Sequence, residues 1–338
     1  MRSPKALFVA ALAAMTLFAA GSAQSADPVK IRIAWVVPVA NWASLLMEKK
    51  DLMQHLGKTY TLETVRFQGT PPMITALASG DLEIADLAYS SFALAIENAG
   101  MSDLKIISDE FQDGIPGYYS DEYFVRNDGS IKSVKDLKGK VIATNAAGSA
   151  VDIAMRAMLR KNGLDDRKDV NIVEAPFPNM KAMLLEKKVD LIPGVLPFSM
   201  NPELRQNAKA LFTQADAIGE TQMIVWAARD SFTKKHRAAM VDLMADTLRV
   251  VRWYLDPANH AAAVKIASDM TKTPPAVWDS WLFTKKDYYR NTDMMPNLKA
   301  LQANMDLQRE LGFLKTKIDV NKYADLSIVK DAAAKLKK

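Results

Sequence analysis

The sequence predicts an α/β fold of two lobes joined by two crossover strands, and three observations support this. The first is the stretch at residues 140–158 (KVIATNAAGSAVDIAMRAM), which has the pattern of a strand, a small-residue loop and a helix. The second is an earlier copy of the same unit. The third is length, because a chain of 338 residues is long enough for two domains with a core each.

The repeat is visible as two nearly equal shifts of the numbering. A shift of 108 residues places Asn41 on Ser149, each after an apolar strand and a loop. A shift of 107 residues superposes residues 70–92 on residues 177–199 without a gap. Both segments run from a proline-started helix through a charged turn to a buried strand. Two lobes of one topology are therefore expected, with the binding site in the cleft between them.

The N-terminus has the features of a secretory signal peptide. Arg2 and Lys5 precede an apolar run at residues 6–20, and small residues follow up to Ala26. The apolar run is too short to span a bilayer. The small residues that follow it predict cleavage after Ala26. The chain contains no cysteine, so neither a cysteine-linked lipid anchor nor a disulfide is expected. We therefore expect a soluble periplasmic protein of a Gram-negative bacterium.

Charge and composition exclude two function classes. The formal net charge is +5, and it falls to +3 without residues 1–26, which hold two basic residues and no acidic one. Basic and acidic residues are interspersed along the chain, and no concentrated basic patch occurs. The sequence therefore does not support nucleic-acid binding. After the leader no run of roughly 18 apolar residues occurs, so we expect no membrane span.

The elements of lobe one follow in order from residue 27. Strands are predicted at residues 29–37, 60–67, 83–88 and 104–108. Helices are predicted up to His55 and from Pro71 to Gly80, since proline is tolerated at a helix start and glycine ends a helix. Residues 89–92 (YSSF) are expected at a strand end, at the same edge as Asn41 and Gln68.

Lobe two begins with an extended crossing at residues 118–125. Strands are predicted at residues 141–144 and 170–174, a further strand end at 193–198, and a returning strand at 221–228, followed by helices to the C-terminus. The expected division is a signal peptide (1–26), the N-terminal part of lobe one (27–120), lobe two with the crossing strands (121–226) and the helical C-terminal part of lobe one (227–338).

Several short motifs resemble a known family. They are residues 136–140 (DLKGK) before a strand, Gly148-Ser149, residues 161–164 (KNGL), and residues 76–81 (ALASGD) before another strand. In their order and spacing along the chain, these motifs resemble those of the periplasmic solute-binding proteins of ABC importers. The narrower resemblance is to the group that binds aliphatic sulfonates, taurine, nitrate and pyrimidine precursors of thiamine, and it covers essentially the whole mature chain.

The resemblance implies a periplasmic binding protein fold of the two-crossover type (type II). Its lobes would close on a small molecule and present it to an ABC permease in the inner membrane, with no cofactor and no metal, as a monomer. Carried over residue by residue, the resemblance implies a set of ligand-binding positions: Asn41, Trp42, Gln68, Gly69, Ser90 and Ser91 in lobe one, and Asn145, Gly148, Ser149, Phe177 and Phe198 in lobe two.

The aromatic residues near these strand ends favour a small anionic or partly apolar solute, such as a sulfonate or an aromatic carboxylate. Arg66 and Arg126 are candidate partners for an anion, although surface positions in solvent are the ordinary alternative. No arginine is assigned to the cleft by the sequence.

Structural alternatives exist for the candidate residues. Ser149 followed by Asp152 forms a capping-box pattern, in which the helix satisfies its own first amides and an acid would repel an anion. Ser90-Ser91 is also compatible with an ordinary turn. The large aromatic residues Trp42, Phe177 and Phe198 are equally compatible with core positions.

An enzyme is not expected. The three histidines, at positions 55, 236 and 260, are far apart and have no metal-binding spacing, and no cysteine is present for nucleophilic chemistry. Neither a Gly-x-Ser-x-Gly elbow nor a phosphate-binding glycine loop occurs. The alternatives to an importer component are a ligand-sensing periplasmic receptor partner and an exported enzyme of the same fold.

Overall fold

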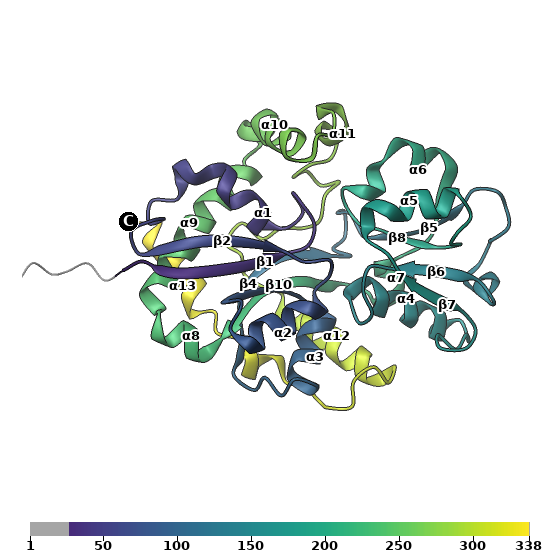
Figure 1. Ribbon diagram of the computed structural model, residues 1–338, viewed down its shortest axis with the longest axis horizontal. Coiled ribbons are helices and arrows are strands. Elements are labelled where there is room, and N and C mark those ends of the chain that lie inside the picture. Colours follow the sequence, from purple (N-terminus) through teal and green to yellow (C-terminus); the bar gives the residue numbers. More distant parts are fainter. Residues whose placement is uncertain (1–26, 338) are drawn as a thin grey trace, which may run out of the picture.

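The computed structural model describes residues 27–337, so the expected signal peptide lies outside the described residues. Two α/β lobes lie next to each other, each built around its own sheet (Figure 1). Lobe one, on the left in Figure 1, holds the strands β1 to β4 and β10, and lobe two, on the right, holds β5 to β9.

The sheet of lobe one has the strand order β2-β1-β3-β10-β4. Its strands are β1 (Val29–Trp35), β2 (Tyr60–Arg66), β3 (Ile84–Ala88), β4 (Leu104–Asp113) and β10 (Thr221–Arg229). The first three are parallel, whereas β10 runs antiparallel between β3 and β4. All of β3 and nearly all of β10 are buried, because helices cover both faces of the sheet.

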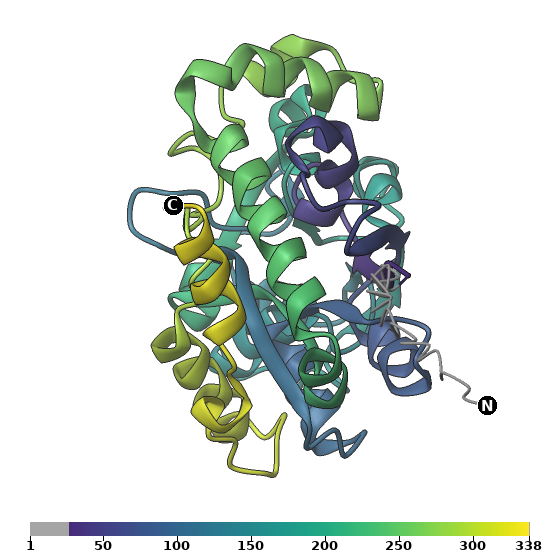
Figure 2. The same cartoon turned by 90° about the vertical axis from the view of Figure 1, so that its left-hand side faces the viewer.

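The helices of lobe one come from both ends of the chain. They are α1 (Trp42–Leu46), α2 (Pro71–Ser79), α3 (Tyr89–Glu97), α8 (Asp230–Lys235), α9 (Arg237–Leu255), α10 (His260–Thr271), α11 (Pro275–Asp279), α12 (Leu298–Glu310) and α13 (Ser327–Lys335). Figure 2 shows α9 beside the C-terminal helix α13, and α3 and α12 both contact β10. Short 3₁₀ helices are η1 (Met47–Leu52), η2 (Val134–Leu137), η3 (Phe198–Met200), η4 (Pro257–Asn259) and η5 (Val320–Tyr323).

Lobe two repeats the strand arrangement of lobe one. Its strands are β5 (Glu122–Arg126), β6 (Val141–Thr144), β7 (Asn171–Glu174), β8 (Ile192–Gly194) and β9 (Ala208–Thr213), and its helices are α4 (Ala150–Lys161), α5 (Phe177–Leu185), α6 (Pro202–Asn207) and α7 (Gln214–Ile218). A parallel bridge between Ile142 and Leu191 joins the β6-β7 pair to the β8-β5-β9 ladder. The combined order, β7-β6-β8-β5-β9, matches that of lobe one, as the sequence repeat predicted.

The chain crosses between the lobes twice, after β4 and before β10. β10, which was expected as the returning strand at residues 221–228, pairs with β3 and β4 of lobe one. Residues 89–92 follow β3 directly, as predicted, but they form the first turn of α3. Among residues 27–337 no helix has the length and hydropathy needed to cross a membrane.

Candidate functional site

A cavity of about 60 Å³ lies between the two lobes, where the carboxyl ends of their parallel strands meet. Lobe one contributes the ends of β1 and β3, and lobe two contributes the start of α4 and the segment after β8. The lining residues are Val36, Val37, Ala40, Asn41, Thr70, Asp86, Ala88, Phe111, Asp121, Asn145, Ser149, Ala150, Val151, Phe177, Val195, Leu196, Met223, Ile224 and Tyr288. Most of this wall is apolar.

Direct contacts between the lobes hold them together beside the cavity. The side-chain amide of Gln68 donates to the Asn145 carbonyl, and the side-chain amide of Asn145 donates to the Gln68 carbonyl, both at 3.2 Å. The Tyr89 hydroxyl donates to the Ala150 carbonyl at 2.9 Å. Because each contact joins one lobe to the other, the described arrangement is that of a closed clamp.

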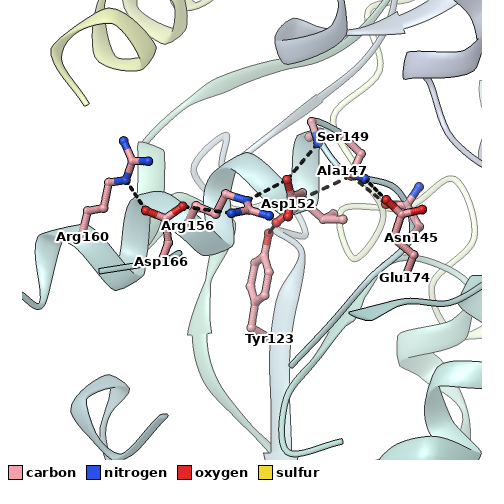
Figure 3. Close-up of polar contacts among 12 residues, drawn as sticks. Tyr123, Asn145, Ala147, Ser149, Asp152, Arg156, Arg160, Asp166 and Glu174 are labelled. Carbon is pink, nitrogen blue, oxygen red and sulfur yellow. Dashed lines mark hydrogen bonds and ion pairs between the residues drawn. The ribbon is translucent and has the colours of Figure 1, made fainter. Parts of the chain in front are cut away.

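The N-terminus of α4, at the cavity, is already satisfied by the chain's own acceptors (Figure 3). Ser149 caps the helix by accepting from the Asp152 amide, and Asp152 accepts from the Gly148 amide at 2.8 Å. Glu174 accepts from the Ala147 amide at 2.8 Å. Two carboxylates thus occupy amides of the loop that would otherwise attract an anion.

Asp152 also begins a chain of ion pairs along α4 (Figure 3). Arg156 bridges Asp152 and Asp166 at 2.9 and 3.0 Å, and Arg160 contacts Asp166 at 2.5 Å. Burial opposes ionisation of Asp166, but the hydrogen bonds from the two arginines outweigh it and lower its pKa. These ion pairs tie α4 to the loop that follows it.

Six of the predicted site residues lie at the cleft. Asn41, Asn145, Ser149 and Phe177 line the inner cavity, while Gln68, Phe177 and Phe198 line an adjoining outer space of about 370 Å³. The rings of Phe177 and Phe198 stack with centroids 6.1 Å apart. Both side chains are half-buried, which makes them walls of the cleft mouth instead of core residues.

Asn41 has a structural role beside its position on the cavity wall. Its Oδ1 accepts from the amides of Val36 and Val37 at 3.0 and 2.7 Å, and its amide donates to Glu110 at 3.2 Å. These bonds fix the loop between β1 and α1. They occupy the side-chain oxygen of a residue that was predicted to bind the ligand.

Trp42 lies away from the cavity, contrary to expectation. It is fully buried, stacks on Phe283 with centroids 5.6 Å apart, and carries the Arg290 guanidinium 4.7 Å above its ring. Its indole donates to the Glu110 carbonyl at 3.1 Å. Trp42 is therefore part of the core of lobe one.

Four other predicted residues do not line the cavity. Ser90 and Ser91 are buried in the first turn of α3, and the Ser91 hydroxyl pairs with that of Thr70 at 2.5 Å. Gly69 and Gly148 lie where the lobes touch, so that a Cβ at Gly69 would approach Ala146 to 2.9 Å. The absence of a side chain at Gly69 thus permits close contact between the lobes.

The sequence interpretation missed Asp86, Asp121, Thr70, Phe111 and Tyr288, all of which line the cavity. Two of them carry a signal in the sequence: Asp86 is a charged residue inside the apolar run of β3 (IADLA), and Thr70 follows Gln68 and Gly69 at the end of a predicted strand. The others lie in the crossover or on elements whose position depends on distant parts of the chain.

Buried carboxyl groups gather near the first crossover. Burial raises the pKa of Asp113 to about 7, although the Ser120 hydroxyl and the Asp121 amide hydrogen-bond to its charged form. Burial and the neighbouring Asp113 carboxylate raise the pKa of Asp121 far above its usual range, despite a 2.5 Å hydrogen bond from the Tyr288 hydroxyl. This pair sits where the chain passes from β4 to β5.

The two candidate arginines lie in different places. Arg66 lines the outer spaces of the cleft and lies 5.3 Å from the ring centroid of Trp35. Arg126 is occupied elsewhere in lobe two, where it pairs with Asp190 at 2.7 Å and donates to the Val189 carbonyl. Within residues 27–337, no cluster of His, Asp or Glu side chains has the arrangement of a metal site.

The fold and the cleft together define the class of two-lobed periplasmic binding protein-like chains. The sequence matches the NMT1-like family over residues 24–268, and the chain belongs to that family. No curated protein matches the sequence.

Solved structures with this fold include both binding proteins and an enzyme. The alkanesulfonate-binding protein of Xanthomonas axonopodis pv. citri, bound to MOPS, is 20% identical and has a TM-score of 0.69, with 89% of this chain and 99% of that chain covered. The periplasmic nitrate-binding protein of Synechocystis PCC 6803 is 12% identical with a TM-score of 0.71 and coverage of 91% and 89%. A desulfurization enzyme is 13% identical with a TM-score of 0.63 and coverage of 91% and 99%.

A methyl group at Gly69 should hold the lobes apart. In Gly69→Ala the new Cβ would lie 2.9 Å from Cβ of Ala146 and 3.0 Å from Nδ2 of Asn145, well inside ordinary contact distance. We expect a larger radius of gyration by small-angle X-ray scattering, with a change in the free energy of unfolding below about 1 kcal/mol.

The matched control is the double variant Gly69→Ala/Ala146→Gly, which removes the opposing methyl group and should restore the wild-type radius. An unchanged radius in the single variant would show that the glycine does not limit closure.

Stability should depend on pH through Asp113. Its pKa is about 7 in the folded protein and about 3.9 in an unfolded chain, so the folded state binds more protons between these values. The contribution is fully present below about pH 4 and is lost as the pH rises through about 7, by roughly 1 kcal/mol per pH unit. Urea titrations from pH 4 to 8 should show a shallower decline for Asp113→Asn than for wild type. Parallel curves for the two proteins would contradict this.

Proposed function

We propose that the chain is the periplasmic substrate-binding component of an ABC importer, which captures a small solute in the cleft by closure of the two lobes. The observation that carries the proposal is the closed cavity between the two strand edges, bounded by Asn145 and Ser149 on one side and Asn41 on the other. The family match and the similarity of fold to a sulfonate-binding and a nitrate-binding protein support it.

The proposal includes export, a soluble monomer and docking to a permease. The sequence of residues 1–26 supports export through a cleaved signal peptide. The division of each lobe around its own core, linked by only two crossovers, is suited to hinge motion between an open form and a closed form.

Binding without chemical conversion is part of the same proposal. A desulfurization enzyme has the same fold, and a cysteine-to-serine variant of it was solved with biphenyl-2-sulfinic acid. This chain has no cysteine. The Ser149 hydroxyl, the one serine hydroxyl among the described lining residues, is engaged in a hydrogen bond of 2.7 Å to Asn145. We therefore favour capture of the solute over conversion.

A thermal-shift screen tests the proposed function. The purified protein without residues 1–26 should be stabilised by at least one member of a panel of sulfonates, aromatic carboxylates, nitrate, pyrimidines and small amines. A ligand at 100 times its Kd should raise the free energy of unfolding by about 2.7 kcal/mol. Chromatography of the recovered ligand should show it unchanged.

The control for closure is Gly69→Ala, in which the stabilisation should be reduced. Lack of stabilisation by every panel member would contradict the proposal, and conversion of the ligand would favour the enzyme alternative. Stimulation of ATP hydrolysis by a reconstituted permease from the same operon would separate transport from sensing.

A further inference from the structure

Asp86 stands out among the buried carboxyl groups of lobe one. It lies in the central strand β3, has 0% of its surface exposed, and neither carboxyl oxygen has a hydrogen-bond partner among the described residues. Asp86 and Ala88 share one face of the strand, and both line the inner cavity. The side chain is therefore directed at the space between the lobes.

Other buried carboxyl groups in the same lobe are satisfied by the protein. Asp246 accepts from the amides of Gln54 and His55 and from the Tyr60 hydroxyl. Asp109 accepts from the side-chain amide of Gln222 at 2.5 Å and from the Asn291 amide at 3.4 Å. A buried carboxylate without partners is costly, so its retention at the cavity wall points to a partner that arrives with the ligand.

The rest of the cavity wall defines the chemistry of that partner. None of the described residues that line the cavity is Lys, Arg or His. A second carboxyl oxygen on the wall, Oδ2 of Asp121, also lacks a partner. The amides of Ala147 and Gly148 before α4 are already bound by Glu174 and Asp152. The inner cavity is thus poorly suited to a negative charge, although the sequence led us to expect a small anionic or partly apolar solute.

A positively charged nitrogen satisfies these conditions. An ammonium or amidinium group donates several hydrogen bonds and neutralises a carboxylate. The neighbouring Val36, Val37, Met223 and Ile224 provide apolar surface for the body of such a molecule.

We propose that the cleft selects a small solute by an ammonium or amidinium group that hydrogen-bonds to Asp86 at the inner wall of the cavity, with its apolar body against the surrounding aliphatic side chains. This assignment rests on the proposed solute-binding function and specifies the ligand class. An acidic group at the other end of the solute would face the outer cleft, where Arg66 lies.

Matched pairs of probes that differ in one group test the proposal. Calorimetric titrations at pH 7 would compare benzylamine with benzyl alcohol, benzamidine with benzamide, and 2-aminoethanesulfonate with ethanesulfonate. We expect the cationic member of at least one pair to bind wild-type protein at least tenfold more tightly. In Asp86→Asn the preference should disappear.

The Tm of the unliganded protein distinguishes a ligand-binding role of Asp86 from a structural role. Because Asp86 has no partner in the protein, Asp86→Asn should leave the Tm of the unliganded protein unchanged or raise it. The control Asp109→Asn removes a carboxylate with protein partners, so it should lower the Tm while the preference for the cationic probe remains. If Asp86→Asn does not fold, Asp86→Leu provides the same comparison with an apolar side chain.

Equal affinity within all three pairs, or a preference that survives in Asp86→Asn and Asp86→Leu, would overturn the assignment of Asp86 and leave the proposed function standing. Binding of Zn²⁺ alone that depends on Asp86 would also overturn it. If neither these probes nor the wider panel stabilises the wild-type protein, the proposed function itself fails.

Discussion

The reciprocal hydrogen bonds between Gln68 and Asn145 hold the carboxyl ends of two sheets against each other. They form because Gly69 has no side chain, which lets the loop after β2 approach the loop after β6. Once the two edges are in contact, the positions of Asn41, Ser149 and Phe177 around one cavity follow from the repeated topology. Closure and the shape of the site are therefore set by the same contact.

The strand and helix pattern made most of this arrangement predictable. Asn41 and Ser149 were placed at one cleft because both follow a strand and start a helix, and the carboxyl ends of parallel strands gather at one edge. Residues 89–92 were placed at the end of β3, but the helix α3, which begins there with no intervening loop, was not predicted. The pattern of apolar residues predicts where the strand lies, but it does not predict whether a loop or a helix follows.

Side-chain direction could not be predicted where it depends on residues far away in the sequence. Trp42 turns into the core because Phe283 and Arg290, from a loop more than 200 residues later, cover its ring. Nothing near Trp42 indicates that partner. Asp86 differs, because an acidic residue within a buried strand is unusual by itself and marks a position that needs a partner.

Buried acidic residues lie both at the cavity and at the crossover between the lobes. Asp113 and Asp121 lie at the crossover, and Asp86 lies on the central strand that faces the cavity, so these buried groups require protons or hydrogen-bond donors from elsewhere. Protein donors such as Ser120 and Tyr288 supply part of that need at the crossover. At Asp86 they supply none, so a bound cation would stabilise the closed form more than the open one. Such a difference in affinity is the condition for a ligand to drive closure.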